Sequence, residues 1–181
     1  MLWQLPENNN MQERKMGSQL QIEPIGENPL DLIEHIAAGR QWSFERGGDE
    51  EITLSLPGQW AEYQLTLNWN EDIESLHLAC MFDFKAPEAR RGETGKLILR
   101  LNEQLWLGNF DLWRDEGALL FRYGALLAGG ADINVLQCET MLQLALEACE
   151  RFYPAFQYVI WAGHTAEEAM EIALFETVGT A

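Results

Sequence analysis

The chain has 181 residues, 47% of them hydrophobic, and its 29 acidic against 12 basic residues leave a formal net charge of −17 at pH 7. This length suits one well-cored domain and is short for two. A surface this acidic repels nucleic acid and anionic membranes, because proteins bind both through Lys and Arg. The expected partner is therefore a basic or amphipathic protein or peptide.

The first 27 residues are rich in Asn, Gln, Glu and Pro and show no hydrophobic period. They predict a flexible N-terminal arm, with Leu20 and Ile22 as candidates for docking on the body, ahead of a single domain at residues 28–181. The arm lacks the basic and apolar regions of a secretion signal. No stretch reaches the roughly 18 consecutive apolar residues of a membrane helix.

The three cysteines favour a reducing compartment. Cys138 and Cys149 lie on one predicted helix, about 16 Å apart at the rise of an α-helix, which is beyond disulfide reach. With Cys80 they make an odd number and contain no CxxC pair. We therefore expect buried free thiols and a cytoplasmic protein.

The first predicted element is a short helix. Asn28 can cap it, Pro29 suits its first turn, and Gly39 can close it. From residue 41 to 84 the hydrophobic period then changes to two, in four runs separated by RGGDE, PGQWAE and NEDIES. This pattern predicts a four-stranded antiparallel meander with one apolar face.

The first of these turns contains Gly-Gly-Asp-Glu, residues 47–50, which nucleotide-signalling cyclases carry on a hairpin. A cyclase would need metal-binding aspartates on an earlier strand, yet only one helix and one strand precede Gly47. Glu51 also stands where a cyclase has Phe. We therefore interpret the motif as a tight turn with glycine at positive φ.

A second helix is predicted from about Pro87, with Leu97, Leu101 and Leu105 on one stripe and its end at Gly108. Residues 109–127 predict a β-hairpin, with its turn at residues 115–117.

The last third of the chain is predicted to be helical. A helix from Asp132 to about Phe152, continued or kinked at Pro154, has one narrow polar stripe and must be covered on two sides, by the sheet and by another helix or subunit. Thr165 with Glu168 forms a capping box for a final helix. The fold class is therefore α+β, in the order α-ββββ-α-ββ-α-α, with helices on one face of an antiparallel sheet.

No constellation for catalysis is evident. His35, His77 and His164 show no metal-ligand spacing, and the chain contains no GxSxG, P-loop or GxGxxG motif. We expect no catalytic, cofactor-binding or metal-binding residues, and no enzyme.

The arginines permit two interpretations. Each can pair with a nearby carboxylate or cover apolar surface with its stem. Alternatively, four of them build an anion pocket, which would make the protein a small-ligand sensor that controls its oligomeric state. These four are Arg90, Arg91, Arg114 and Arg122.

Aromatic residues are the strongest feature, with seven Trp in the chain. Most must be buried, since each stabilises by roughly 1.5–3 kcal/mol when it leaves water. The apolar surface nevertheless exceeds what one sheet face can cover, so we expect part of it to contact a client protein or a second copy in a homodimer. The candidates for partner binding are Trp106, Trp113, Phe152, Tyr153, Phe156 and Trp161.

Six blocks together resemble the YbjN-domain family, bacterial proteins described as sensory-transduction regulators. The blocks are NPLDLIEHIAAGRQWSFER, PGQWAEYQLTLNW, APEARRG, LNEQLWLGNFDLW, CERFYPAFQYVIWAG and AMEIALFETVG, and they span residues 28–179. The resemblance implies an α+β fold similar to type III secretion chaperones, which are non-enzymatic, acidic and commonly dimeric. It carries over no catalytic residue. The leading hypothesis is a non-catalytic, chaperone-like regulatory protein that binds a partner.

Overall fold

The computed structural model describes residues 28–178, with side chains described up to residue 172. The predicted N-terminal arm and the docking of Leu20 and Ile22 lie outside this range. The elements follow the predicted order, so the α+β fold class is confirmed. They are α1 (Pro29–Arg40), β1 (Ser43–Gly47), β2 (Glu51–Pro57), β3 (Glu62–Asn70), η1 (Glu71–Ile73), β4 (Ser75–Lys85), α2 (Glu88–Asn102), β5 (Asn109–Trp113), β6 (Ala118–Leu126), α3 (Val135–Ile160) and α4 (Ala166–Val178).

The six strands form one sheet in the order β1-β2-β3-β4-β6-β5, and every neighbouring pair is antiparallel. The hairpin β5–β6 joins the meander through β6, which pairs with β4 in a register that places Leu78 opposite Tyr123. The sequence could not choose this pairing, because α2 separates the two parts of the sheet along the chain.

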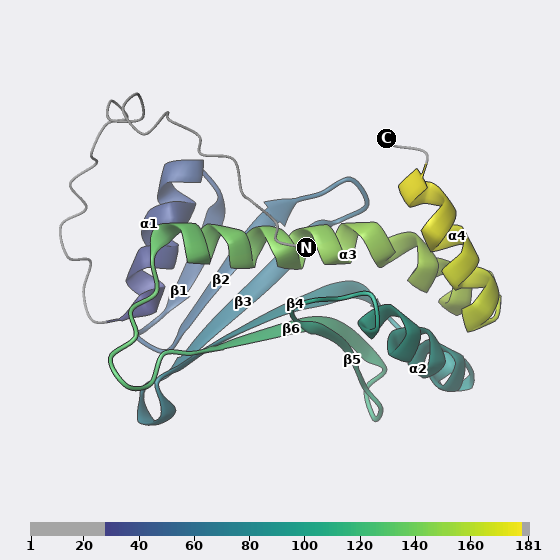
Figure 1. Cartoon of the computed structure of the whole chain (residues 1–181). Coiled ribbons are helices and arrows are strands. Elements are labelled where there is room, and N and C mark those ends of the chain that lie inside the picture. Colours follow the sequence, from purple (N-terminus) through teal and green to yellow (C-terminus); the bar gives the residue numbers. More distant parts are fainter. Residues whose placement is uncertain (1–27, 179–181) are drawn as a thin grey trace, which may run out of the picture.

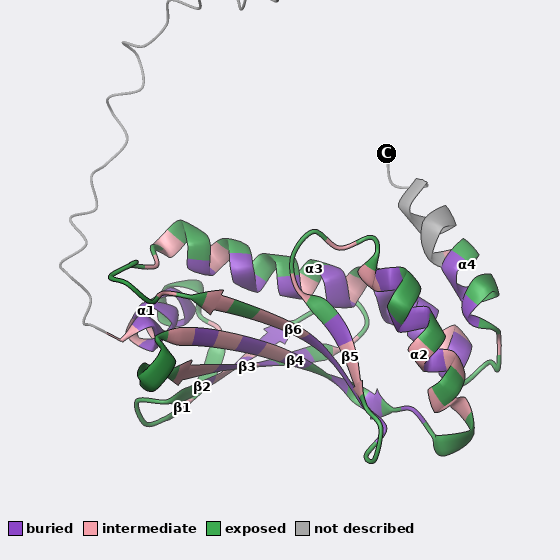
Figure 2. Ribbon diagram, turned by 60° about the horizontal axis from the view of Figure 1, so that its bottom comes forward, coloured by how far each residue is buried: buried purple, intermediate pink, exposed green. Residues whose placement is uncertain are grey.

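All four helices lie on one side of the sheet. In Figure 1, α3 crosses the sheet, α1 lies near one end of it, and α2 and α4 lie near the other. The covered face carries the buried apolar residues of β2 to β6, and Figure 2 shows burial alternating along the strands. The other face has no helix of the described chain against it. No helix in the described range is long and apolar enough to cross a membrane.

The Gly-Gly-Asp-Glu motif is a turn, as predicted. It connects β1 to β2, with Gly48 at φ 75°. The same turn helps to seat α1, because Asn28 accepts a hydrogen bond from the Leu30 N–H at 2.9 Å and donates one to the Asp49 carbonyl at 2.7 Å. One asparagine therefore caps the helix and ties it to the hairpin.

Three predicted helix boundaries differ from the structure. α1 runs past Gly39 and ends when Gln41 takes the left-handed conformation at φ 59°. α3 begins later than Asp132, because Asn134 and Gln137 form a reciprocal capping box. It also continues to residue 160 with Pro154 inside it, where buried neighbours hold the helix against the sheet. The capping box that starts α4 is present as predicted.

The predicted end of the second helix is wrong in a way that matters for function. α2 stops at Asn102, so Leu105 and its neighbours are not helical. Instead, the Asn102 side chain binds the backbone of Phe110 at the edge of the sheet. Residues 103–108 consequently form a loop, hereafter the 103–108 loop, which projects between α2 and β5.

Candidate functional site

The 103–108 loop presents a tryptophan to solvent. Trp106 is 99% exposed and Leu107 is 50% exposed. The base of the loop is pinned: Gly108 has φ 74°, and a Cβ atom placed on it would lie 2.2 Å from the Phe121 ring. Only glycine fits this crowded left-handed position, so the loop returns to the sheet along one path.

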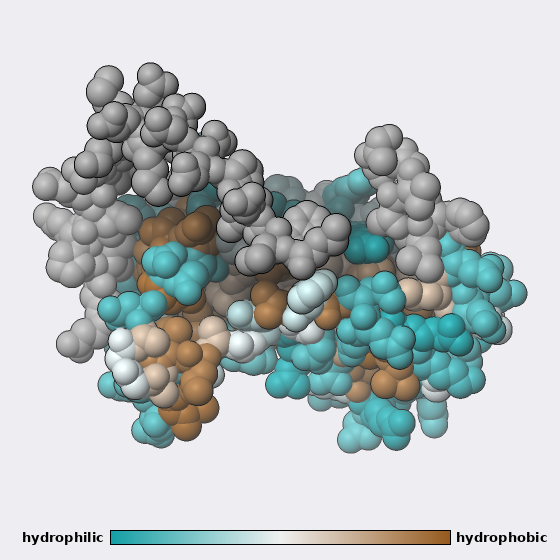
Figure 3. Space-filling model, viewed as in Figure 1, coloured by the Kyte–Doolittle hydropathy of each residue, from teal (hydrophilic) through white to brown (hydrophobic). Residues whose placement is uncertain are grey.

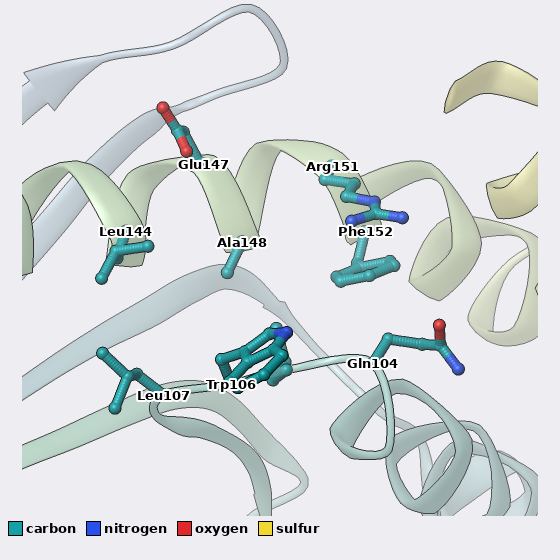
Figure 4. Close-up of a pocket in the computed structure, with 9 residues that line it drawn as sticks. Gln104, Trp106, Leu107, Leu144, Glu147, Ala148, Arg151 and Phe152 are labelled. Atoms are coloured by element: carbon teal, nitrogen blue, oxygen red, sulfur yellow. The ribbon is translucent and has the colours of Figure 1, made fainter. Parts of the chain in front are cut away.

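An apolar pocket lies between this loop and α3 (Figure 4). We call it the Trp106 pocket; its volume is about 220 Å³. Figure 4 shows the Trp106 ring below the helix, near Ala148 and Phe152, and Leu107 opposite Leu144. The lining residues are Gln104, Leu105, Trp106 and Leu107 from the loop and Leu144, Glu147, Ala148, Arg151 and Phe152 from α3.

Two of the lining residues carry opposite charges: Arg151, and Glu147, whose carboxylate points away from Trp106 in Figure 4. The Arg151 guanidinium carbon lies 4.9 Å from the centre of the Phe152 ring, a cation–π contact that holds the cation over apolar surface. Glu147 accepts a hydrogen bond from Gln143 at 2.6 Å. Neither charge forms an ion pair within the described chain. Both charges on this part of α3 are therefore available to a charged or polar partner beside the apolar residues of the pocket.

The six aromatic residues proposed for partner binding divide into two groups. Phe152, Tyr153 and Phe156 are at most 3% exposed, so the expectation that they face a partner is wrong for all but the edge of Phe152 that lines the pocket. They are buried because α3 turns this stripe toward the sheet. The three tryptophans are exposed but lie apart: Trp106 is on the 103–108 loop, Trp113 ends β5, and Trp161 follows α3.

The four arginines of the predicted anion pocket do not converge. Arg90 donates to the carbonyls of Val159, at 2.8 Å, and of His164, which ties α2 to the end of α3. Arg91 donates to the Ala86 carbonyl at 3.2 Å. Backbone oxygens at these ends need donors, so two of the four guanidinium groups fulfil a structural task.

Arg122 lies on the uncovered face of the sheet, away from Arg90. It donates to His77 Nε2 at 3.3 Å and pairs with Asp111 at 3.0 Å, so it bridges three neighbouring strands. Arg114 lies in the turn between β5 and β6 and is exposed. None of the four arginines lines the Trp106 pocket.

The residues that line the pocket include no Ser, Cys or His, and the two that are ionisable are Glu147 and Arg151. Cys80, Cys138 and Cys149 are buried and free, and burial raises the pKa of Cys138 to about 12. Within residues 28–178 no group of three or more His, Cys, Asp or Glu side chains is placed to hold a metal ion. The arrangement is suited to binding.

Sequence reasoning named Trp106 but missed most of its surroundings, including Leu107, Leu144 and Arg151. It extended α2 through the loop, which would have placed Leu105 in a helical stripe. The signal that could have prevented this is Asn102, a residue that favours helix ends, followed by three consecutive apolar residues that fit no helical period.

Comparison with known proteins supports one assignment. A search of curated proteins gave no match. The profile of the YbjN family, described as "putative bacterial sensory transduction regulator", matches residues 29–158, which include the sheet, α1, α2 and nearly all of α3. The match spans well over half of the chain and both walls of the Trp106 pocket, so the chain belongs to the YbjN family.

Proposed function

We propose that this YbjN-family member is a non-catalytic regulatory protein that binds a segment of a partner protein, in the manner of a chaperone. The Trp106 pocket holds an apolar side chain of that segment. The observation that carries the proposal is the complete exposure of Trp106 on a pinned loop. Tryptophan is enriched among the few residues that dominate protein interfaces, and a loop that is already ordered loses little entropy on binding.

The size of the pocket favours a side chain over a free metabolite. Its volume of about 220 Å³ lies below the roughly 300–1,000 Å³ of pockets for drug-sized ligands. It is open to solvent beside Trp106, so a partner can add the missing wall. One anchoring side chain in a small apolar hollow, with charged residues beside it, is the usual anatomy of a protein interface.

Charge restricts the class of partner. The net charge of −17, and the mostly hydrophilic area that Figure 3 shows toward α2 and α4, favour an amphipathic segment with basic residues around its apolar anchor. Glu147, exposed on α3 beside the pocket, can pair with a basic residue of such a segment, and Arg151 can pair with an acidic one. The buried free thiols fit a reducing compartment, so we place this function in the cytoplasm.

Affinity capture with Trp106→Ala tests the proposal. Partners captured by the wild-type protein are identified by mass spectrometry, purified, and titrated by calorimetry against both forms. We expect Trp106→Ala to weaken binding about 30-fold, the effect of removing a dominant interface residue. Trp106 is fully exposed, so replacing it removes no buried side-chain area. The urea unfolding curve of Trp106→Ala should therefore match that of the wild-type protein.

Trp113→Ala is the matched control, since it removes an exposed tryptophan that lies at the other end of β5 and does not line the pocket. It should leave the affinity unchanged. Equal binding by Trp106→Ala and wild type would contradict the proposal. A wild-type dimer that Trp106→Ala converts to a monomer, measured by light scattering, would instead identify a second copy as the occupant.

A further inference from the structure

A row of residues four positions apart runs along α3 and leads into the Trp106 pocket. Residues at this spacing are neighbours on a helix, and the row turns gradually around the axis because 3.6 residues make one turn. We call this row the α3 ridge; its members are Leu136, Thr140, Leu144 and Ala148. Leu136 is 71% exposed, Leu144 is 36% exposed and Ala148 is 7% exposed, so the ridge leads from open solvent into the pocket.

The ridge is apolar although its first half is open to solvent. Its one polar member, Thr140, donates its hydroxyl hydrogen to the Leu136 carbonyl at 2.6 Å, so this donor needs no partner outside the helix. Figure 4 shows Leu144 and Ala148 on the side of α3 that faces Leu107, which is 50% exposed. The ridge therefore extends the apolar lining of the pocket along α3 for about three helical turns.

A partner that covers this ridge must satisfy its own backbone hydrogen bonds. Between Thr140 and Ala148 the backbone N–H and C=O groups of α3 are paired within the helix, so none of them is free to bond an added strand. An extended segment laid on the ridge would bury main-chain groups that have no partner. An α-helix pairs these groups internally and presents only its side chains. The ridge therefore favours a helical segment.

The charges of α3 favour a basic segment. Before Arg151, the charged residues of the helix are all acidic: Glu139, Glu147 and Glu150. Glu139 pairs with Arg40, whereas Glu147 is exposed and forms no ion pair within the described chain. Opposite charges across an interface speed association and fix its orientation. Lys or Arg beside the apolar stripe of a partner would therefore complement this side of α3.

We propose that the segment bound at the Trp106 pocket is an amphipathic α-helix of the partner protein, with one apolar stripe and a basic polar face. This inference rests on the function proposed above and adds the conformation of the segment and the surface that it covers. One apolar side chain of the helix enters the pocket, and further side chains of its stripe lie along the α3 ridge as far as Leu136. When such rows of two helices interdigitate, the axes cross at about 50°, so the partner helix crosses α3 obliquely.

Three synthetic peptides, titrated into the full-length protein, test the proposal. LKKLLKKLLKKLLK has leucines at helical spacing, LKLKLKLKLKLKLK has the same composition at strand spacing, and LEELLEELLEELLE has an acidic polar face. We expect the first peptide to bind, to become helical by circular dichroism, and to shift the NMR amide signals of residues 136–148 and of the 103–108 loop. The second should bind about tenfold more weakly, and the third should not bind. Equal affinity of the first two peptides, or no binding of the first, would overturn the proposal.

Leu136→Ser and Leu99→Ser form a matched pair of variants. The two leucines are 71% and 69% exposed, but Leu99 lies on α2 and outside the ridge. Both variants should unfold at the urea concentration of the wild-type protein, because neither substitution removes a buried side chain. Leu136→Ser should weaken the first peptide about three- to tenfold, since the partner no longer covers a leucine. Leu99→Ser should leave the affinity unchanged, and Trp106→Ala should lower it.

These variants also separate the inference from the proposed function. If Leu136→Ser binds the first peptide as tightly as Leu99→Ser does, the helix does not cover the ridge and the inference is wrong. A loss of affinity in Trp106→Ala alone would then leave the function proposed for the pocket intact. A loss in Leu136→Ser without one in Trp106→Ala would show a helix that has no anchor in the pocket, which also contradicts the inference.

Discussion

The side-chain amide of Asn102 makes both of the hydrogen bonds that a neighbouring strand would offer to Phe110. Its Oδ1 accepts from the Phe110 N–H at 2.8 Å, and its Nδ2 donates to the Phe110 carbonyl at 3.2 Å. This contact closes the outer edge of β5 against strand addition and sets the base of the 103–108 loop. One residue thus protects an edge strand and positions Trp106.

Asn102→Ala should lower the free energy of unfolding by about 1–3 kcal/mol, because the partly buried Phe110 N–H loses its partner. Urea denaturation followed by circular dichroism measures the change. Gln104→Ala, an exposed change in the same loop with no side-chain hydrogen bond, should leave the midpoint unaltered. Equal midpoints for Asn102→Ala and Gln104→Ala would show that the Asn102 contact contributes nothing to stability.

Gly108→Ala should destabilise the protein by about 2–3 kcal/mol. The new methyl group would meet the Phe121 ring at 2.2 Å and the Arg122 carbonyl oxygen at 2.9 Å, at a positive φ that alanine disfavours. Thermal or urea unfolding measures this loss. Gly124→Ala, on the same sheet with open space around its Cβ position, is the control and should change stability by less than about 0.5 kcal/mol. If Gly108→Ala were as stable as the wild-type protein, the 103–108 loop could adopt another backbone conformation.

Stability should fall in mildly acidic solution because of His77. Burial, and then the positive charge of Arg122, lower the pKa of His77 below its ordinary value of about 6.5. Between that value and the lower folded pKa, the unfolded chain binds a proton that the native protein does not. The free energy of unfolding therefore rises with pH through this window and loses the His77 contribution as pH falls through it.

His77→Gln keeps an acceptor for Arg122 but cannot titrate. Urea unfolding of both forms between pH 5 and pH 8 should show a smaller loss of stability for the variant below pH 6.5. The two forms should have parallel stability profiles above pH 7. Parallel profiles over the whole range would show that His77 titrates alike in the folded and unfolded chain.

Much of the fold follows from local patterns. The period-two runs between residues 41 and 84 predicted four strands, and the turn residues between them predicted an antiparallel meander, as the sheet shows. Asn28 and the Thr165–Glu168 pair predicted where two helices begin. These signals succeed because caps, turns and strand faces depend on residues within a few positions of one another.

The candidate site was only partly predictable for the same reason. Aromatic density pointed to Trp106, but equally to Phe152, Tyr153 and Phe156, which are core residues. Which aromatic residues face solvent depends on how α3 is rotated against the sheet. That rotation is set by contacts between residues far apart in the chain.

By itself the sequence determined the class of the fold, the acidity of the surface, most turns and caps, and the family resemblance. Each of these depends on composition or on residues that are close together along the chain. Only the tertiary structure decided that α2 stops at Asn102, that β4 pairs with β6, and that Arg90 and Arg122 lie on different sides of the sheet. Each of these outcomes depends on a contact across the chain, such as Asn102 with Phe110. Such contacts compete with local preference and form only when the sheet and helices are assembled.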